Sequence, residues 1–295
     1  MQIIDAHIHF SDTEMLKMTA RNISHLDYSA AGLSAEFKKS NVVLGIGMGL
    51  TEATKNAFPC SEIDNPMRLD LEANLPDRVV CCPGINPTKL QGAELNIQLS
   101  RIEAELQREN VVGLKIYAGY YHYYVYDKIY GPIYELASHY HLPVVIHSGD
   151  TYSDRGLLRY SHPLAVDELA VTHRDITFVI AHLGCPWVMD TAEVVYKNEN
   201  VYSDFSGLVV GDQELGECIE EPLFLNQMRS GMVYSGYKKY LFGSDWPLTK
   251  LKPYIDFAKK IIPEKHHDDF FYNNAVTIFP KTEKILAKIG AEDTD

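Results

Sequence analysis

Eight short runs of apolar and β-branched residues recur along the chain, and longer segments with helical periodicity separate them. The segment 94–108, for example, carries apolar residues at three-to-four spacing, as amphipathic covering helices do. Alternating units of this kind build a parallel sheet, and eight of them close a barrel. We therefore expect an α/β fold, a single-domain (β/α)8 TIM barrel. The eight runs cover residues 3–9, 42–48, 79–84, 111–117, 143–147, 177–182, 201–205 and 240–245.

A doubly wound open sheet is the alternative fold. It usually carries a G-x-G-x-x-G phosphate turn, and the glycines at 45, 47 and 49 do not fit that spacing. Since no Pro/Gly/Ser-rich linker or repeat divides the chain, we expect the barrel over 1–280 and a helical tail over 281–295, with its helix at 284–289. The long connections 11–33 and 117–134 follow strands, so they are candidate pocket walls.

Charge and hydropathy exclude several classes of partner. Lys and Arg number 27 against 40 Asp and Glu, so the net charge of −13 disfavours nucleic acid. No apolar run approaches the roughly 20 residues of a membrane helix, and the chain opens directly into a predicted strand instead of a signal peptide. Five cysteines without a C-x-x-C fit a reducing compartment. We expect a cytoplasmic protein that does not bind membranes.

Histidine and aspartate stand at the ends of several predicted strands, where burial would be costly without a metal, a substrate or a paired charge. His7 and His9 lie on one strand, two residues apart, and therefore share a face about 6 to 7 Å apart. His147, His182 and Asp245 end three other strands at the same rim. Each alone has an ordinary explanation, such as a backbone hydrogen bond or a turn. Together they predict a metal centre.

His7, His9, His147 and Asp245 offer three nitrogens and one oxygen to one divalent ion. This set suits zinc, and also manganese, iron or cobalt, and the ligand types alone do not choose among them. We expect zinc. Such an ion can lower the pKa of a bound water to about 7. His182 is then the expected proton carrier beside that water.

These strand ends resemble the amidohydrolase superfamily, and more narrowly its amidohydrolase-related branch of lactonases, other hydrolases, hydratases and metal-dependent nonoxidative decarboxylases. The resemblance implies metal ligands at His7, His9 and His147, an aspartate at Asp245 that binds the metal or takes a proton, and a catalytic imidazole at His182. The motifs that carry it are Asp-Ala-His-Ile-His-Phe at 5–10, His-Ser-Gly at 147–149, Ala-His-Leu-Gly at 181–184 and Gly-Ser-Asp-Trp-Pro at 243–247.

Four further residues are candidates to bind substrate. Lys115 occupies the place where binuclear relatives carry a carboxylated lysine, but the branch resembled here usually holds a single metal. We therefore expect a free ammonium that binds an anionic group, instead of a surface lysine. Tyr117 in the tyrosine-rich run could wall the pocket, while His122 and Arg155 could hold an anion.

Two activities fit these residues. The first is a metal-dependent hydrolase that cleaves a C–N or ester/lactone bond of a small, carboxylated substrate. The alternative is a nonoxidative decarboxylase of an unsaturated or aromatic acid, with the same ligands. Leu183 after His182 favours hydrolysis, since the decarboxylases tend to carry glycine there. A non-catalytic barrel is disfavoured because structural zinc sites are closed and often rich in thiolates. The aromatic content and the habit of the family favour a homodimer.

Overall fold

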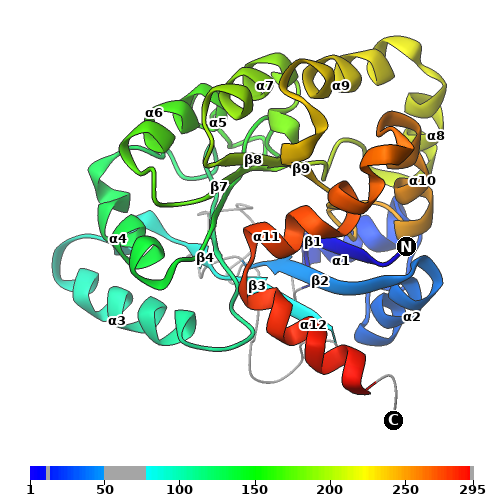
Figure 1. The fold of residues 1–295 in the computed structure, drawn as a ribbon. Coiled ribbons are helices and arrows are strands. Elements are labelled where there is room, and N and C mark those ends of the chain that lie inside the picture. Colours follow the sequence, from blue (N-terminus) through cyan, green and yellow to red (C-terminus); the bar gives the residue numbers. More distant parts are fainter. Residues whose placement is uncertain (11–13, 50–77, 293–295) are drawn as a thin grey trace.

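The computed structural model describes residues 1–10, 14–49 and 78–292. Its strands coincide with the eight predicted runs, except that the third extends one residue further, to Ile85. Pro83, which has no N–H to donate, divides that third run in two. Figure 1 shows the strands at the centre of the molecule with helices around them. The strands are β1 (Ile3–Ile8), β2 (Val42–Met48), β3 (Val79–Cys82), β4 (Gly84–Ile85), β5 (Leu114–Ile116), β6 (Val144–Ile146), β7 (Phe178–Ile180), β8 (Val201–Asp204) and β9 (Tyr240–Leu241).

All strand pairs are parallel and join neighbours in sequence, in the orders β1-β2-β3 and β4-β5-β6-β7-β8-β9. Backbone hydrogen bonds connect the two sheets at both seams. The amide of Ala6 donates to the carbonyl of Phe242 (2.9 Å), and the amide of Val112 donates to that of Cys81 (2.9 Å). The fold is a single-domain TIM barrel, as the βα pattern predicts.

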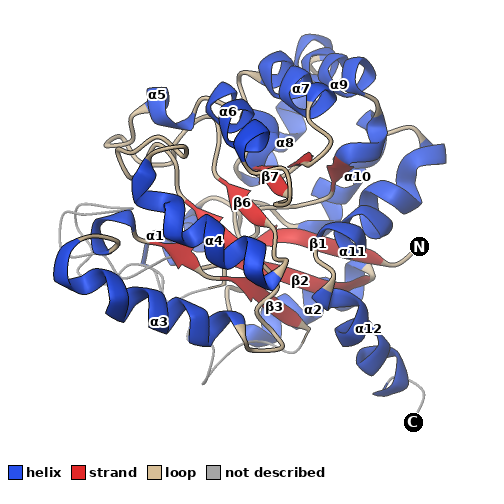
Figure 2. Ribbon diagram, turned by 60° about the vertical axis from the view of Figure 1, so that its left-hand side comes forward, coloured by secondary structure: helices blue, strands red, loops and turns tan. Residues whose placement is uncertain are grey.

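Helices cover the outside of the strands (Figure 2). The segment predicted at 94–108 is α3, and the predicted connection 11–33 contains α1 and the start of α2, while residues 11–13 lie outside the described part. Among the described helices, none is long and apolar enough to cross a membrane. They are α1 (Glu14–Asn22), α2 (Ala30–Ser40), α3 (Leu95–Leu106), α4 (Gly131–Tyr140), α5 (Leu158–Ser161), α6 (Leu164–Thr172), α7 (Val188–Lys197), α8 (Gly211–Glu220), α9 (Pro222–Ser235), α10 (Leu251–Ile261), α11 (Asn274–Ile278) and α12 (Lys281–Glu292).

Alternate residues of each strand enter two different buried clusters, because side chains in a strand point to opposite faces. Leu114 and Ile116 pack with the covering helices. Val145, Val179 and Leu241 pack inside the barrel with α11. The tail helix α12 is longer than predicted, since it packs Ile285, Leu286 and Ile289 against this inner cluster. The domain boundary at residue 280 stays a prediction.

Candidate active site

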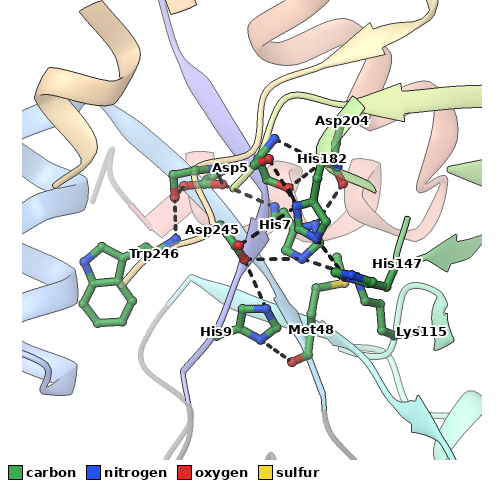
Figure 3. A network of polar contacts seen from close by, with 12 residues as sticks. Asp5, His7, His9, Met48, Lys115, His147, His182, Asp204, Asp245 and Trp246 are labelled. Carbon is green, nitrogen blue, oxygen red and sulfur yellow. Dashed lines mark hydrogen bonds and ion pairs between the residues drawn. The ribbon is translucent and has the colours of Figure 1, made fainter. Parts of the chain in front are cut away.

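The predicted site residues gather at the carboxyl ends of the strands, where Figure 3 shows their side chains converging. Among those that meet there, His7, Lys115, His147, His182 and Asp245 are buried, and His9 is partly buried. His7 lies in β1 and His9 just after it, while Lys115 is in β5. His147, His182 and Asp245 follow β6, β7 and β9. The TIM barrel thus brings together residues that lie up to 238 positions apart in sequence (245 − 7 = 238).

The backbone is strained where two of these side chains enter the site. His182 and Asp245 both adopt the left-handed region with φ of 61°, which costs a residue other than glycine roughly 1–3 kcal/mol. Gly207 sits between them with φ of 63°. A Cβ there would lie 2.6 Å from Asp245 Oδ2 and 2.7 Å from His182 Nδ1. The position therefore has no room for a side chain.

Two imidazole nitrogens approach one carboxylate oxygen. Nε2 of His9 lies 3.1 Å, and Nε2 of His7 3.6 Å, from Oδ1 of Asp245. The Nδ1 atoms of both rings form hydrogen bonds on the side away from Asp245. Nδ1 of His7 is 2.8 Å from Oδ2 of Asp204, and Nδ1 of His9 is 3.2 Å from the carbonyl of Met48. Both partners are acceptors, so each Nδ1 donates its hydrogen and each ring turns its Nε2 toward Asp245.

This convergence fits a divalent cation. Asp245 Oδ1 is buried, and no described residue donates a hydrogen bond to it in suitable geometry. Imidazole nitrogens and carboxylate oxygens are the ligands that transition metals prefer, and three of them lie close together here. Among the described residues, the groups able to hold an ion are His7, His9 and Asp245, and His7, His182 and Asp204.

The protonation states also suit metal binding. Burial, with the Lys115 ammonium second, lowers the pKa of His7 to about 3, so its ring is neutral at pH 7. Burial would raise the pKa of Asp245, but the contact with His9 and the imidazoles of His182 and His7 hold it well below its ordinary value. For Asp204, burial is likewise outweighed, by His7, His182 and Ser206. Both carboxylates are therefore anionic.

His147 lies beside His182, with its Nδ1 3.1 Å from Nε2 of that ring. Its Nε2 is 2.8 Å from the carbonyl of Asp150. The structure thus brings three of the four predicted ligands to one point and places His147 next to them, so its role as a ligand stays a prediction. His182 has its Nδ1 3.1 Å from the carbonyl of Ser206 and 4.0 Å from Asp245 Oδ2. Burial lowers the pKa of both rings.

A cavity of about 490 Å³ opens above these groups. Lys115 lines it from a wholly buried position, with its Nζ 3.4 Å from His7 Nε2 and 5.2 Å from the centre of the Tyr117 ring. Burial lowers the pKa of Lys115 to about 8, so the ammonium still predominates at neutral pH. Tyr120 lines the cavity as well, with its ring edge-on to His147 at 4.8 Å. Leu208, Val209 and Leu248 form an apolar wall.

His122 and Arg155 lie outside that cavity lining. Both are exposed, and Nε2 of His122 lies 3.2 Å from the carbonyl of Arg155. The structure brings these two residues together with each other and separates them from Lys115 and the histidines. The predicted contact of these two residues with a bound anion stays a prediction.

Sequence reasoning missed two carboxylates that hold the site together. Asp204 contacts His7 from behind. Asp5 accepts hydrogen bonds from the amide (2.9 Å) and hydroxyl (2.6 Å) of Ser244, which precedes Asp245. Both acids are charged residues in buried strands. A polar residue at the end of an apolar strand is the pattern that identified His147, and the same pattern could have identified Asp5 and Asp204.

Comparison with known proteins assigns the family. A family model described as Amidohydrolase matches residues 4–281. A comparison with curated proteins gave no match. Among solved structures, an uncharacterized TIM-barrel protein from Bordetella bronchiseptica is 15% identical with a TM-score of 0.66, over 96% of this chain and 100% of that one.

Two further solved structures have printed activities. A probable 2-pyrone-4,6-dicarboxylic acid hydrolase from Acinetobacter baumannii, with citric acid bound, is 16% identical with a TM-score of 0.61, over 95% of this chain and 100% of that one. A 5-carboxyvanillate decarboxylase from Novosphingobium aromaticivorans, complexed with manganese and a nitrobenzoic acid, is 11% identical with a TM-score of 0.60, over 95% and 96%. At these identities the structures show the shared barrel alone. Because the family model matches nearly the whole chain, the protein belongs to the amidohydrolase family.

Proposed function

We propose that the protein is a metal-dependent hydrolase that cleaves a C–N or ester/lactone bond of a small, carboxylated substrate. The observation that carries the proposal is the convergence of His7 Nε2, His9 Nε2 and Asp245 Oδ1 beside a cavity that His9 and Asp245 line. Lys115 and His182 line the same cavity. One place thus combines a cation site, an anion-binding ammonium and a base.

His7, His9 and Asp245 would hold one divalent ion, with His147 as the fourth ligand. Zinc is the proposed metal, and manganese, iron and cobalt suit the same donors. The family is metal-dependent, and the decarboxylase of the same fold was crystallised with manganese. A bound divalent ion supplies a Lewis acid that polarises the scissile carbonyl and acidifies the attacking water.

The protein side chains bind the substrate and move the proton. The Lys115 ammonium pairs with the substrate carboxylate, and Tyr117 and Tyr120 wall the cavity beside it. Nδ1 of His182 donates to the carbonyl of Ser206, which leaves Nε2 as the base that takes the proton of the water. His182 returns this proton to the leaving group, while Asp245, 4.0 Å away, stabilises the imidazolium.

An isotope experiment tests the reaction class. The protein would be loaded with zinc or manganese and offered carboxylated lactones, esters and amides in water enriched in ¹⁸O. Hydrolysis places one oxygen from water in the acid product, which mass spectrometry detects as a shift of about 2 Da. Protein treated with a chelator serves as the control, and full turnover in that control would contradict the metal-dependent scheme.

A nonoxidative decarboxylase is the second candidate. The observation that favours it is the aromatic wall of Tyr117 and Tyr120, which suits a flat unsaturated or aromatic acid. His182 would then protonate a carbon instead of activating water. Release of carbon dioxide without ¹⁸O in the organic product would identify this reaction.

The proposed partner is therefore a small anionic molecule. In keeping with this, the hydrolase and decarboxylase of the same fold were crystallised with citric acid and a nitrobenzoic acid. A homodimer and a cytoplasmic location stay predictions, and light scattering on the purified protein tests the first.

A further inference from the structure

Asp204 is buried at the end of β8 and contacts two parts of the site at once (Figure 3). Its Oδ2 lies 2.8 Å from Nδ1 of His7. Its Oδ1 accepts hydrogen bonds from the amide of His182 (3.0 Å), the amide of Ser206 (3.1 Å) and the hydroxyl of Ser206. One oxygen thus serves the candidate metal site, and the other serves the segment around the candidate base.

An ionised aspartate can only accept hydrogen bonds. The short contact with Asp204 therefore requires that Nδ1 of His7 carries the proton, and a neutral ring then keeps a lone pair on Nε2. That Nε2 lies 3.6 Å from Asp245 Oδ1 and 3.4 Å from Lys115 Nζ. With the opposite tautomer, Nε2 would carry a hydrogen and would be unable to ligate a cation.

We infer that Asp204 is a positioning residue, which sets the tautomer of His7 for metal binding and, through Ser206, orients His182. The hydroxyl of Ser206 donates to Asp204 and lies 2.9 Å from Nδ1 of His182. A single carboxylate thereby couples the cation site to the base. The inference rests on the proposed function for the metal site, but the tautomer itself is measurable without metal or substrate.

Asp204→Asn is a sharp test because the surroundings fix which way the amide turns. Three donors, from His182 and Ser206, face Oδ1, so the amide oxygen must stay on that side. The amide NH₂ then faces His7 Nδ1, which must accept the hydrogen bond and give its own proton to Nε2. We expect the near-isosteric variant to fold and its affinity for zinc or manganese to fall about 10- to 100-fold.

Long-range ¹⁵N–¹H spectra of the full-length, metal-free protein with ¹⁵N-labelled histidine identify the tautomer, and a His7→Gln variant assigns the signal. The wild type should show Nδ1–H and Asp204→Asn should show Nε2–H. Competition with a chromogenic chelator measures the affinity for zinc. An Nε2–H tautomer of His7 in the wild type overturns the inference even if the variant does not fold. An unchanged zinc affinity in a folded Asp204→Asn protein overturns it as well.

Ser206→Ala separates the two proposed roles of Asp204, at His7 and at His182. It removes the hydroxyl between Asp204 and His182 and leaves the contact of Asp204 with His7. Zinc affinity should stay within about twofold, while kcat falls at least tenfold with KM unchanged. Ser203→Ala is the matched control, because this buried hydroxyl of the same strand donates to the carbonyl of Ile180 (2.7 Å). A loss of zinc affinity in Ser206→Ala, or an equal loss of kcat in Ser203→Ala, contradicts the division of roles. If the proposed hydrolase activity fails, the tautomer and zinc measurements still decide the inference.

Discussion

The lower interior of the barrel and its upper rim are equally buried but have opposite chemistry. In the lower part, Val145, Val179 and Leu241 form an apolar cluster, and each side chain removed from water there stabilises the fold. At the rim, other strands of the barrel carry groups such as Lys115 in β5 and Asp204 in β8, whose burial costs free energy. Burial of apolar side chains at one end of the barrel therefore offsets the free-energy cost of burying charged groups at the other end.

The largest expected effect is a loss of stability when the apolar cluster inside the barrel is disrupted. Leu241→Ala removes a fully buried side chain from the inner cluster and should lower the free energy of unfolding by about 2–5 kcal/mol, because a cavity remains. Urea unfolding followed by circular dichroism measures the loss. Zinc affinity of the folded variant should not change, and a loss below about 1 kcal/mol would contradict the assigned role of this cluster.

The next largest expected effect is a loss of turnover when a charged residue at the rim is replaced. Asp245→Asn should reduce turnover at least 10²-fold, since it weakens both the cation site and the charge beside His182. The fold should be retained, because the change keeps the shape of the side chain. Steady-state kinetics on the active substrate checks this, with Asp167→Asn at the surface ion pair with Lys197 as the matched control. Turnover equal to that of the control would argue against the catalytic role.

Replacing Lys115 measures what a buried charge costs. The pKa of this lysine is lowered from 10.5 to about 8 by burial, so between these pH values the unfolded chain binds a proton that the folded protein does not. Stability attributable to Lys115 should therefore rise as pH rises from about 8 to 10.5, by roughly 3 kcal/mol. Without added metal, Lys115→Met should lack this rise. Loaded with zinc or manganese, the same variant should show kcat/KM for anionic substrates lowered roughly tenfold. Parallel pH–stability curves for the two proteins would refute the expectation.

The smallest expected effect concerns His122 and Arg155, which lie apart from the rim cluster. His122 and Arg155 are exposed and outside the cavity lining, so an effect on an anionic substrate would act by long-range attraction. Arg155→Ala should lower kcat/KM about two- to threefold at low ionic strength, and the difference should vanish at about 1 M salt. A larger loss that survives salt would instead indicate direct contact with the substrate.

The sequence predicted the barrel and much of the rim because each strand carries its own signal. His7 and His9 share a face through the two-residue period, and Asp245 follows a run too apolar to be a loop. Burial in strands therefore predicts which residues meet. The third strand is divided at Pro83, which has no backbone N–H. Whether a missing N–H interrupts a strand depends on the neighbouring strand, and the sequence of this segment does not show that neighbour.

The contacts behind the rim could not be predicted in the same way. Which nitrogen of His7 faces the cation depends on Asp204, which lies 197 residues away in sequence. The place of His147 beside His182 depends on the carbonyl of Asp150, a backbone group present at every position of any chain. Such side-chain orientations arise from the packing of three strands, so the sequence of a single segment does not reveal them.

The tight fit at Gly207 separates what can vary in this enzyme from what cannot. A methyl group there would collide with Asp245 and His182, while the next residue, Leu208, carries a full side chain that borders the cavity and packs in the main core. A substitution at residue 208 would change the wall of the cavity, whereas any side chain at residue 207 would displace the two groups on which the proposed reaction depends.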